Sequence, residues 1–181
     1  MIKIDQLNNE RVNDFLEYVT IHLSENGINE TPLFQPLTKK QSNLSDEWKE
    51  RFENGLKKDI NNSGWRKLWI ATNQENKIVG HVDIRSHSES NTEHRVLLGM
   101  GVDSNFRNLK IGQKLIEFII TYCKNNRIIC WIDLQVLTNN IPAIKLYKKM
   151  NFKVQSNIFD MFRIDNISYD YTSMTLNVET K

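Results

Sequence analysis

The sequence predicts an α/β protein built on a central, mixed and mostly antiparallel sheet of seven strands, with helices on both faces. Seven short segments rich in β-branched and aromatic residues predict the strands, and four segments with apolar residues at helical spacing predict the helices. Along the chain these elements follow the order β-α-α-β-β-β-α-β-α-β-β. The 181 residues contain no linker and no internal repeat, so we expect one domain over residues 1–181.

The first part of the chain is expected to contribute one strand and two helices. Residues 2–7 alternate apolar and polar side chains, which predicts a strand. Five apolar residues at helical spacing then predict a helix that ends near Gly27, namely Val12, Phe15, Leu16, Val19 and Leu23. Residues 28–44 hold two of the three prolines and are expected to form an irregular loop. Ser45 is a good N-cap for a second helix.

The middle of the chain predicts a hairpin and a strand–helix–strand unit. Residues 65–72 and 77–85 are β-rich runs around a short polar turn. A strand at 95–102, a helix from about 110 to 125 and a strand at 128–137 follow. Such a crossover is right-handed and makes its two strands parallel. The run at 128–137 is nearly continuously apolar, which predicts a strand buried on both faces.

The last third is expected to complete the sheet. A short helix is predicted for residues 141–150, where Pro142 falls in the first turn. Two strands near 157–164 and 167–178 then form a hairpin around Asp165 and Asn166.

Composition excludes several classes of protein. The chain carries 24 Lys and Arg against 22 Asp and Glu, a net charge of +2, which argues against a nucleic-acid binder. No apolar run reaches the roughly 18–20 residues of a membrane span, and the N-terminus does not resemble a signal peptide. Cys123 and Cys130 fit no metal or redox spacing, so we expect buried thiols, no metal and a cytoplasmic location.

The junction between the strand ending at Val102 and the helix starting near Lys110 predicts an anion site. A helix start presents free backbone N–H groups and the positive end of the helix dipole. Arg107, Lys110 and Lys114 add positive charge. The glycine spacings of a P-loop or a dinucleotide fingerprint are missing, so the expected ligand is a phosphate or pyrophosphate held in another way.

Two motifs in this part of the chain resemble those of the GNAT superfamily of N-acetyltransferases. The segment R-N-L-K-I-G from Arg107 to Gly112 resembles the acyl-CoA signature Q/R-x-x-G-x-G/A, with Lys110 in place of a glycine. The segment from Asn140 to Phe152 resembles N-x-x-A-x-x-x-Y-x-x-x-G-F, with Asn151 in place of a glycine. Lys110 can still offer its N–H there if its φ is negative, and its side chain can add a charge-assisted contact. We expect Asn151 to adopt a left-handed conformation after the helix end.

The resemblance implies acetyl-CoA as co-substrate, lying between the splayed ends of the strands at 95–102 and 128–137. The glycines in L-G-M-G-V suit a bulged strand that a ligand approaches closely. By position, the residues implied in cofactor binding are Met100, Gly101, Val102, Arg107, Asn108, Leu109, Lys110, Ile111, Gly112, Gln113 and Asn140.

The implied chemistry is acyl transfer from a thioester to an amine, which needs an acid and a route for the amine's proton. Tyr147 matches the family tyrosine that protonates the departing thiolate. For the base, His81 with Asp83 is the first candidate and His94 the second, because a histidine titrates near neutrality. Gln135 falls where some family members carry a glutamate, and an amide cannot take up the proton. A water relay without a single base is the competing alternative.

The acceptor is expected to be a small-molecule primary amine, such as an amino acid or a polyamine. Its pocket is expected from residues 27–44 and 157–172, with several aromatic residues and with Asp160 and Asp165 available to hold a cation. The alternatives are a protein or peptide amine acceptor, which needs an open groove, and a non-catalytic acyl-CoA-binding module. We expect a monomer or a homodimer.

Overall fold

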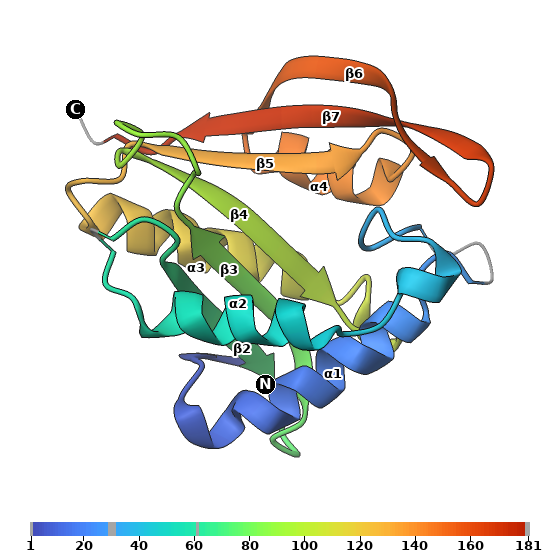
Figure 1. The fold of residues 1–181 in the computed structure, drawn as a ribbon. Coiled ribbons are helices and arrows are strands. Elements are labelled where there is room, and N and C mark those ends of the chain that lie inside the picture. The colour runs from blue at the N-terminus through green and yellow to red at the C-terminus, as the bar shows by residue number, and fades with distance from the viewer. Residues whose placement is uncertain (1, 29–31, 61, 180–181) are drawn as a thin grey trace.

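The computed structural model describes residues 2–28, 32–60 and 62–179, which form one seven-stranded sheet flanked by helices (Figure 1). The strands are β1 (Lys3–Gln6), β2 (Arg66–Thr72), β3 (Ile78–Arg85), β4 (Arg95–Val102), β5 (Trp131–Leu137), β6 (Lys153–Ile164) and β7 (Ile167–Asn177). The α-helices are α1 (Val12–Ser24), α2 (Asp46–Lys57), α3 (Ile111–Asn125) and α4 (Ile141–Lys149). No helix in these described segments is long and apolar enough to cross a bilayer.

The sheet has the strand order β1-β2-β3-β4-β5-β7-β6. Its neighbours pair antiparallel, except for β4 and β5, which are parallel as the crossover through α3 requires. The predicted mixed, mostly antiparallel sheet of seven strands is therefore confirmed. Helices α1 and α2 lie on one face, and α3 and α4 lie on the other (Figure 1).

Two apolar clusters hold these layers together. One side of the sheet packs on α3 and α4 around residues such as Leu115, Ile119 and Ile132. The other side packs on α1 and α2 around residues such as Phe15 and Phe52. Burying apolar surface is the main favourable contribution to folding, so the central strands are fixed from both faces.

Strand β5 is buried along one face but only at Leu137 on the other, which corrects the expectation for residues 128–137. Ile132, Leu134 and Val136 are buried, while Asp133 is half-buried and Gln135 is exposed. This alternation has the two-residue period of a strand, and the less buried face of β5 borders an opening. Cys123 is buried as expected, but Cys130 is partly exposed because it precedes β5.

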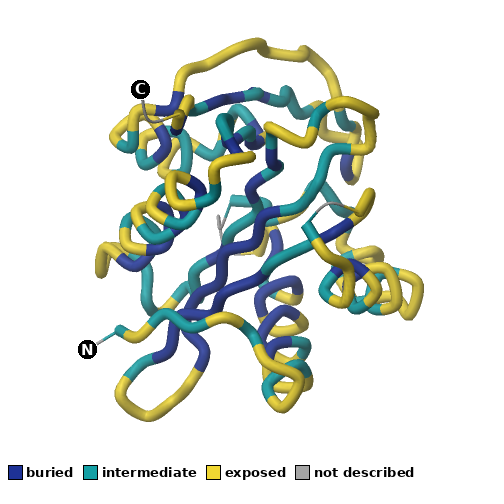
Figure 2. The backbone as a smooth tube through the Cα atoms, turned by 90° about the vertical axis from the view of Figure 1, so that its left-hand side faces the viewer, coloured by how far each residue is buried: buried dark blue, intermediate teal, exposed yellow. Residues whose placement is uncertain are grey.

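The hairpin of β6 and β7 begins earlier than predicted, at Lys153 instead of residue 157. β6 is the edge strand and is exposed almost throughout (Figure 2). Its apolar residues Val154, Ile158 and Phe159 are exposed, and Phe159 is 79% exposed.

Candidate functional site

Strands β4 and β5 pair over only three residues and then diverge. Their parallel register runs from Arg95 opposite Trp131 to Leu97 opposite Asp133, although both strands continue beyond it (Figure 1). The remaining half of β4 therefore has no ladder partner on this side. The predicted splay of the two strands is confirmed.

The main-chain groups on the open side of β4 can be identified from the pairing with β3. The N–H of Asp103 donates to the carbonyl of Val79 on β3. Because N–H direction alternates along a strand, the N–H groups of Met100 and Val102 point the opposite way, toward the opening. The register with β3 is continuous, so the expected bulge at the glycines of β4 is absent.

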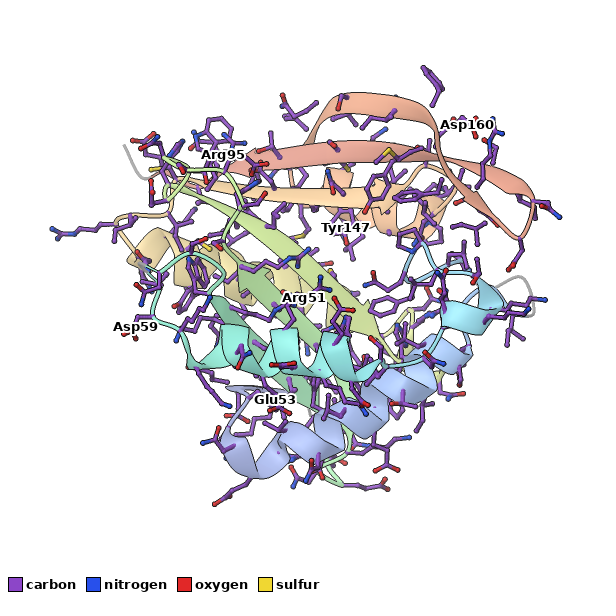
Figure 3. All side chains as sticks on the ribbon, in the orientation of Figure 1. Arg51, Glu53, Asp59, Arg95, Tyr147 and Asp160 are labelled. Carbon is purple, nitrogen blue, oxygen red and sulfur yellow. The ribbon has the colours of Figure 1, made fainter. Side chains whose placement is uncertain are left out.

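A polar cluster fixes the closed end of this opening. The Asp133 carboxylate accepts hydrogen bonds from Arg95 Nε at 2.8 Å and Thr175 Oγ1 at 2.6 Å, and it lies 3.0 Å from His87 Nε2. Arg95, labelled in Figure 3, and these partners lower the pKa of the Asp133 carboxyl, which burial opposes. The cluster joins β4, β5 and β7 at the point where the strands begin to separate.

Six consecutive backbone amides lie free at the other end of β4. The N–H groups from Asn108 to Gln113 donate to no backbone or side-chain acceptor in the described part of the chain. Helix α3 also lacks a side-chain N-cap, whereas Ser45 caps α2 and Asn140 caps α4. Unsatisfied amides at a helix start attract an anion, so this segment has the geometry of a phosphate-binding site.

Lys110 adopts a left-handed conformation at φ 61°, so the condition of a negative φ is not met. The chain turns from the loop into α3 at this residue, and the turn requires the region that a glycine occupies without strain. Asn108 is also left-handed at φ 61°. Alternating left-handed residues aim successive amides at one point. Asn151 is left-handed as expected, at φ 68°.

Gly112 and α4 border the opening on the α3 side. A Cβ atom at Gly112 would lie 3.0 Å from a methyl group of Leu146 and 3.2 Å from the methyl group of Met100. Asn140 uses its side chain to cap α4, accepting from the Ala143 amide at 3.3 Å. The two motifs of the sequence therefore meet, because α4 packs against the start of α3.

Tyr147 lies where α4 passes the second half of β5 (Figure 3). Its side chain is 9% exposed, and its hydroxyl has no hydrogen-bond partner among the described residues. Burial raises the pKa of the Tyr147 phenol, and the neighbouring Tyr171 raises it further. The residue thus holds a proton firmly at the edge of the opening.

On the opposite face of the sheet, Gly101 lies beneath two histidines and a phenylalanine. A Cβ atom there would lie 2.7 Å from His81 Cε1, 3.0 Å from Phe34 Cε2 and 3.1 Å from His22 Nε2. Only a glycine allows these three rings to approach β4 so closely. The rings come from β3, the α1–α2 loop and α1.

His81 and Asp83 engage different partners. His81 Nδ1 lies 3.3 Å from Tyr18 Oη, and burial lowers the pKa of His81 to about 3. Asp83 accepts hydrogen bonds from Arg66 at 2.8 Å and Arg85 at 3.1 Å. His81 and Asp83 are therefore not hydrogen-bonded to each other, unlike the pair expected from the sequence.

His94 lies just before β4 begins, at the end closed by the Asp133 cluster. His94 lies seven residues before Gly101 in the chain, a distance of roughly 23 Å at about 3.3 Å per residue. The structure does not bring His94 to the two other histidines.

His22 is the site residue that the sequence reasoning missed. It is 5% exposed, and its ring lies 4.2 Å from that of Phe34 and 5.8 Å from that of Tyr18. Its spacing of seven residues from Phe15 and four from Tyr18 places it on the buried face of α1. Extending the apolar stripe of this helix to polar residues would have found it.

The loop and the hairpin expected to form the acceptor pocket meet at the open end. The backbone N–H of Lys39 donates to Asp165 at 3.2 Å, which joins residues 32–44 to the β6–β7 turn. Residues 29–31 of the predicted loop lie outside the described residues. Asp160 pairs with Arg163 on the surface, so the expected cation-binding role for Asp160 is wrong.

The sheet surface beneath the acceptor side, here called the floor, carries excess positive charge around Asp83. The single carboxylate of Asp83, 7% exposed, is shared by Arg66 and the more exposed Arg85. Gly99 makes room for them, since a Cβ atom there would lie 3.1 Å from Arg85 Nη1. Burial raises the pKa of Tyr171 on β7, and the positive charge of Arg85 opposes that shift.

Comparisons with known proteins agree with this arrangement. A model of the "Acetyltransferase (GNAT) family" matches residues 34–152. The L-amino acid N-acetyltransferase AaaT of Escherichia coli (strain K12) is 33% identical over 78 residues, which cover 43% of this chain and 48% of that protein. The match thus spans about half of the length of that relative.

Two solved structures share the fold at low sequence identity. An acetyltransferase of the GNAT family from Streptococcus pneumoniae superimposes with a TM-score of 0.80 at 21% identity, over 98% of this chain and 99% of that one. An N-acetyltransferase from Staphylococcus aureus Mu50 gives a TM-score of 0.74 at 16% identity, over 99% of each chain.

Proposed function

We propose that this chain, which belongs to the acetyltransferase (GNAT) family, transfers an acetyl group from acetyl-CoA directly to the primary amine of a small amino-acid-like molecule. The family uses acetyl-CoA, and the observation that carries the proposal is the row of free amides from Asn108 to Gln113 beside the open edge of β4. Backbone donors at a helix start suit the diphosphate of coenzyme A.

Each predicted binding residue has a role in this proposal. The amides at the start of α3 and the Arg107 guanidinium hold the diphosphate. The main-chain groups of Met100 pair with the pantetheine arm, as a neighbouring strand would, and the N–H of Val102 faces the thioester. Gly101 keeps the adjacent face of β4 free of a side chain, and Asn140 borders the arm from α4.

Bound acetyl-CoA supplies a thioester whose carbonyl carbon is open to attack by an amine. In this proposal the N–H of Val102 donates to the carbonyl oxygen as negative charge develops there. Tyr147 then protonates the departing sulfur, and the raised pKa of its phenol, which burial causes, supports a protonated resting state.

Two observations favour a small acceptor. The contact between Lys39 and Asp165 brings the α1–α2 loop against the β6–β7 turn, so the acceptor side is bordered instead of open along its length. A protein substrate would need an uninterrupted groove. The aromatic ring of Phe34 lies on the same side, above Gly101.

The charge of the floor favours an acceptor with a carboxylate. Arg85 donates one hydrogen bond to Asp83, while its Nε and Nη2 groups donate to nothing among the described residues. A planar guanidinium with free donors suits a carboxylate. An L-amino acid presents a carboxylate and an amine together, and the relative AaaT is named for that class.

Release of coenzyme A measured over a panel of amines tests the proposal. The panel contains the L-amino acids, their carboxamides, polyamines and short peptides. We expect turnover with amino acids and at least about tenfold lower kcat/KM with the matching carboxamides, because a charge-assisted pair is lost. Arg85→Gln removes this preference, whereas Lys124→Gln, which removes an exposed charge on α3, leaves it unchanged.

Three results would contradict the proposal. Faster turnover of peptides than of amino acids points to a protein acceptor. Tight binding of acetyl-CoA without turnover of any amine points to a non-catalytic acyl-CoA-binding module. A carboxamide that reacts as well as its amino acid removes Arg85 from substrate recognition.

A further inference from the structure

We propose that His22 accepts the proton from the acceptor's ammonium group, and that a diphosphate bound at Arg107 makes His22 a better proton acceptor. The inference rests on the proposed function, because it assigns a step of the same reaction to a residue outside both sequence motifs. It would make binding of the co-substrate a condition for an effective base.

The first support is the position of His22 above Gly101. Its Nε2 lies 3.1 Å from where a Cβ of Gly101 would be, so the nitrogen lies against the backbone of β4, beside the rings of His81 and Phe34. The N–H of the adjacent Val102 points into the opening where the thioester is proposed. An amine attacking that carbon would therefore pass close to the His22 ring.

The second support is a cavity on the outer side of the same histidine. It has a volume of about 300 Å³ and lies between α1, the β2–β3 turn and the segment from Asp103 to Asn105. His22 and Tyr18 line its inner wall, and Glu17 and Glu25 lie on its α1 side. His22 thus lies between Gly101 and a cavity that several charged side chains line, among them Glu17 and Glu25.

The third support is that His22 has no competing partner. Neither of its ring nitrogens is hydrogen-bonded to a group in the described segments, and the ring is 5% exposed. His81, by contrast, has Nδ1 next to the Tyr18 hydroxyl and does not line the cavity. Of the two histidines above Gly101, His22 is the one that connects both spaces.

Arg107 links His22 to the diphosphate site, because its Nε donates to the Val102 carbonyl at 3.5 Å, next to the Gly101 backbone against which His22 lies. Burial lowers the pKa of His22 to about 4, and Arg107 lowers it further, while Glu25 and Asp103 raise it. A diphosphate paired with Arg107 offsets the positive charge that opposes protonation of His22. The ionisable groups facing His22 or its cavity are Arg11 just before α1, Asp14, Glu17 and Tyr18 from α1, Glu25 just after α1, His81 from β3, Lys77 from the β2–β3 turn, and Asp103 and Arg107 from the β4–α3 loop.

The proposed step balances as follows. The acceptor ammonium gives one proton to His22, and the free electron pair of its nitrogen attacks the thioester carbon to form the C–N bond. The C–S bond then breaks, and the sulfur leaves with the bonding electron pair. The attacking nitrogen then loses its second proton, which replaces the proton that Tyr147 gives to the sulfur. The first proton leaves His22 through the cavity.

NMR titration of the histidine ring carbons tests the coupling without requiring turnover. The protein is labelled at histidine Cε1, and His22→Gln identifies the His22 signal. We expect its titration midpoint to rise by about one pH unit when coenzyme A is added, and by a similar shift in Arg107→Gln without ligand. The midpoint of His87, at the closed end of the sheet, should not move with either change.

The pH dependence of turnover tests the proton transfer itself. We expect His22→Gln to lower kcat by about 100-fold near neutral pH and to remove the acidic limb of the profile. Its affinity for coenzyme A should stay within about twofold, which distinguishes lost chemistry from lost folding. His87→Gln, which can keep a hydrogen bond to Asp133, should retain the wild-type profile.

The outcomes separate this inference from the proposed function. If coenzyme A binds and amines are acetylated but the His22 midpoint stays fixed, the coupling is wrong. If His22→Gln keeps the wild-type kcat and acidic limb, His22 is not the proton acceptor. If coenzyme A does not bind at all, both the inference and the proposed function fail.

Discussion

At the residue scale, Tyr147 offers the most direct separation of chemistry from binding. Its hydroxyl is held protonated by burial at the edge of the opening between β4 and β5. We expect Tyr147→Phe to lower kcat by about 100-fold, with little change in affinity for acetyl-CoA, since the ring still packs on Phe152. Calorimetric titration together with a thiol-release assay checks both numbers. An unchanged kcat would remove Tyr147 from the reaction.

The two buried histidines predict a specific loss of stability in acid. Their folded pKa values, about 4 for His22 and about 3 for His81, lie below the ordinary 6.5. As the pH falls, the unfolded chain therefore binds protons before the folded protein does. The free energy of unfolding decreases as the pH drops from about 6.5 toward 4, so the protein becomes less stable. Between pH 7 and pH 5 each histidine should remove about 2 kcal/mol.

Denaturant unfolding at pH 7 and pH 5 measures this effect. His22→Gln should show about 2 kcal/mol less acid destabilisation than the wild-type protein, because glutamine has no proton to gain. His87→Gln is the control for a half-buried histidine paired with Asp133. An equal loss in His22→Gln and wild type would show that His22 does not titrate abnormally.

At the element scale, the start of α3 departs from the family motif at Lys110. A glycine substitution there and one further along the same helix are expected to change the free energy of unfolding in opposite directions. Lys110 is left-handed, a conformation that costs roughly 1–2 kcal/mol for a residue with a Cβ. We expect Lys110→Gly to raise the free energy of unfolding by about 0.5–1 kcal/mol. Lys114→Gly, in the exposed interior of the same helix, should lower it by about 1 kcal/mol. Chemical denaturation of both variants measures the difference.

The same pair tests the binding role of the backbone. If the amides hold the diphosphate, Lys110→Gly keeps its affinity for coenzyme A within a few-fold, because the N–H groups remain. A large loss of affinity would assign binding to the lysine side chain. Either result is independent of the stability measurement.

Helices and strands were predicted well where a local sequence pattern determines them. The hydrophobic period of α1, the cap at Ser45 and the crossover through α3 depend on neighbours in sequence, and each was correct. The burial of β5 was wrong because apolar character was equated with burial, and β6 begins earlier in the chain than predicted. Exposure of Gln135 and Phe159 depends on where the sheet opens and ends, which no local pattern encodes.

At the scale of the whole molecule, the site depends on contacts between distant segments. The cofactor side was predictable, because its residues lie in two contiguous motifs. The acceptor side was not: His22, Phe34 and Gly101 meet only after α1, the α1–α2 loop and β4 have packed together. Arg85 and Asp83 share a face by alternation, but their pairing with Arg66 requires the register of β2 on β3.

Hydrogen exchange with and without coenzyme A is the measurement that tests the central claim most directly. If the diphosphate lies on the uncapped start of α3 and the arm lies along β4, ligand should slow exchange at the amides of Asn108 to Gln113 and at those of Met100 and Val102. Amides in α2 should be unaffected. Saturating binding that leaves the start of α3 and the open edge of β4 exchanging as before would contradict the account.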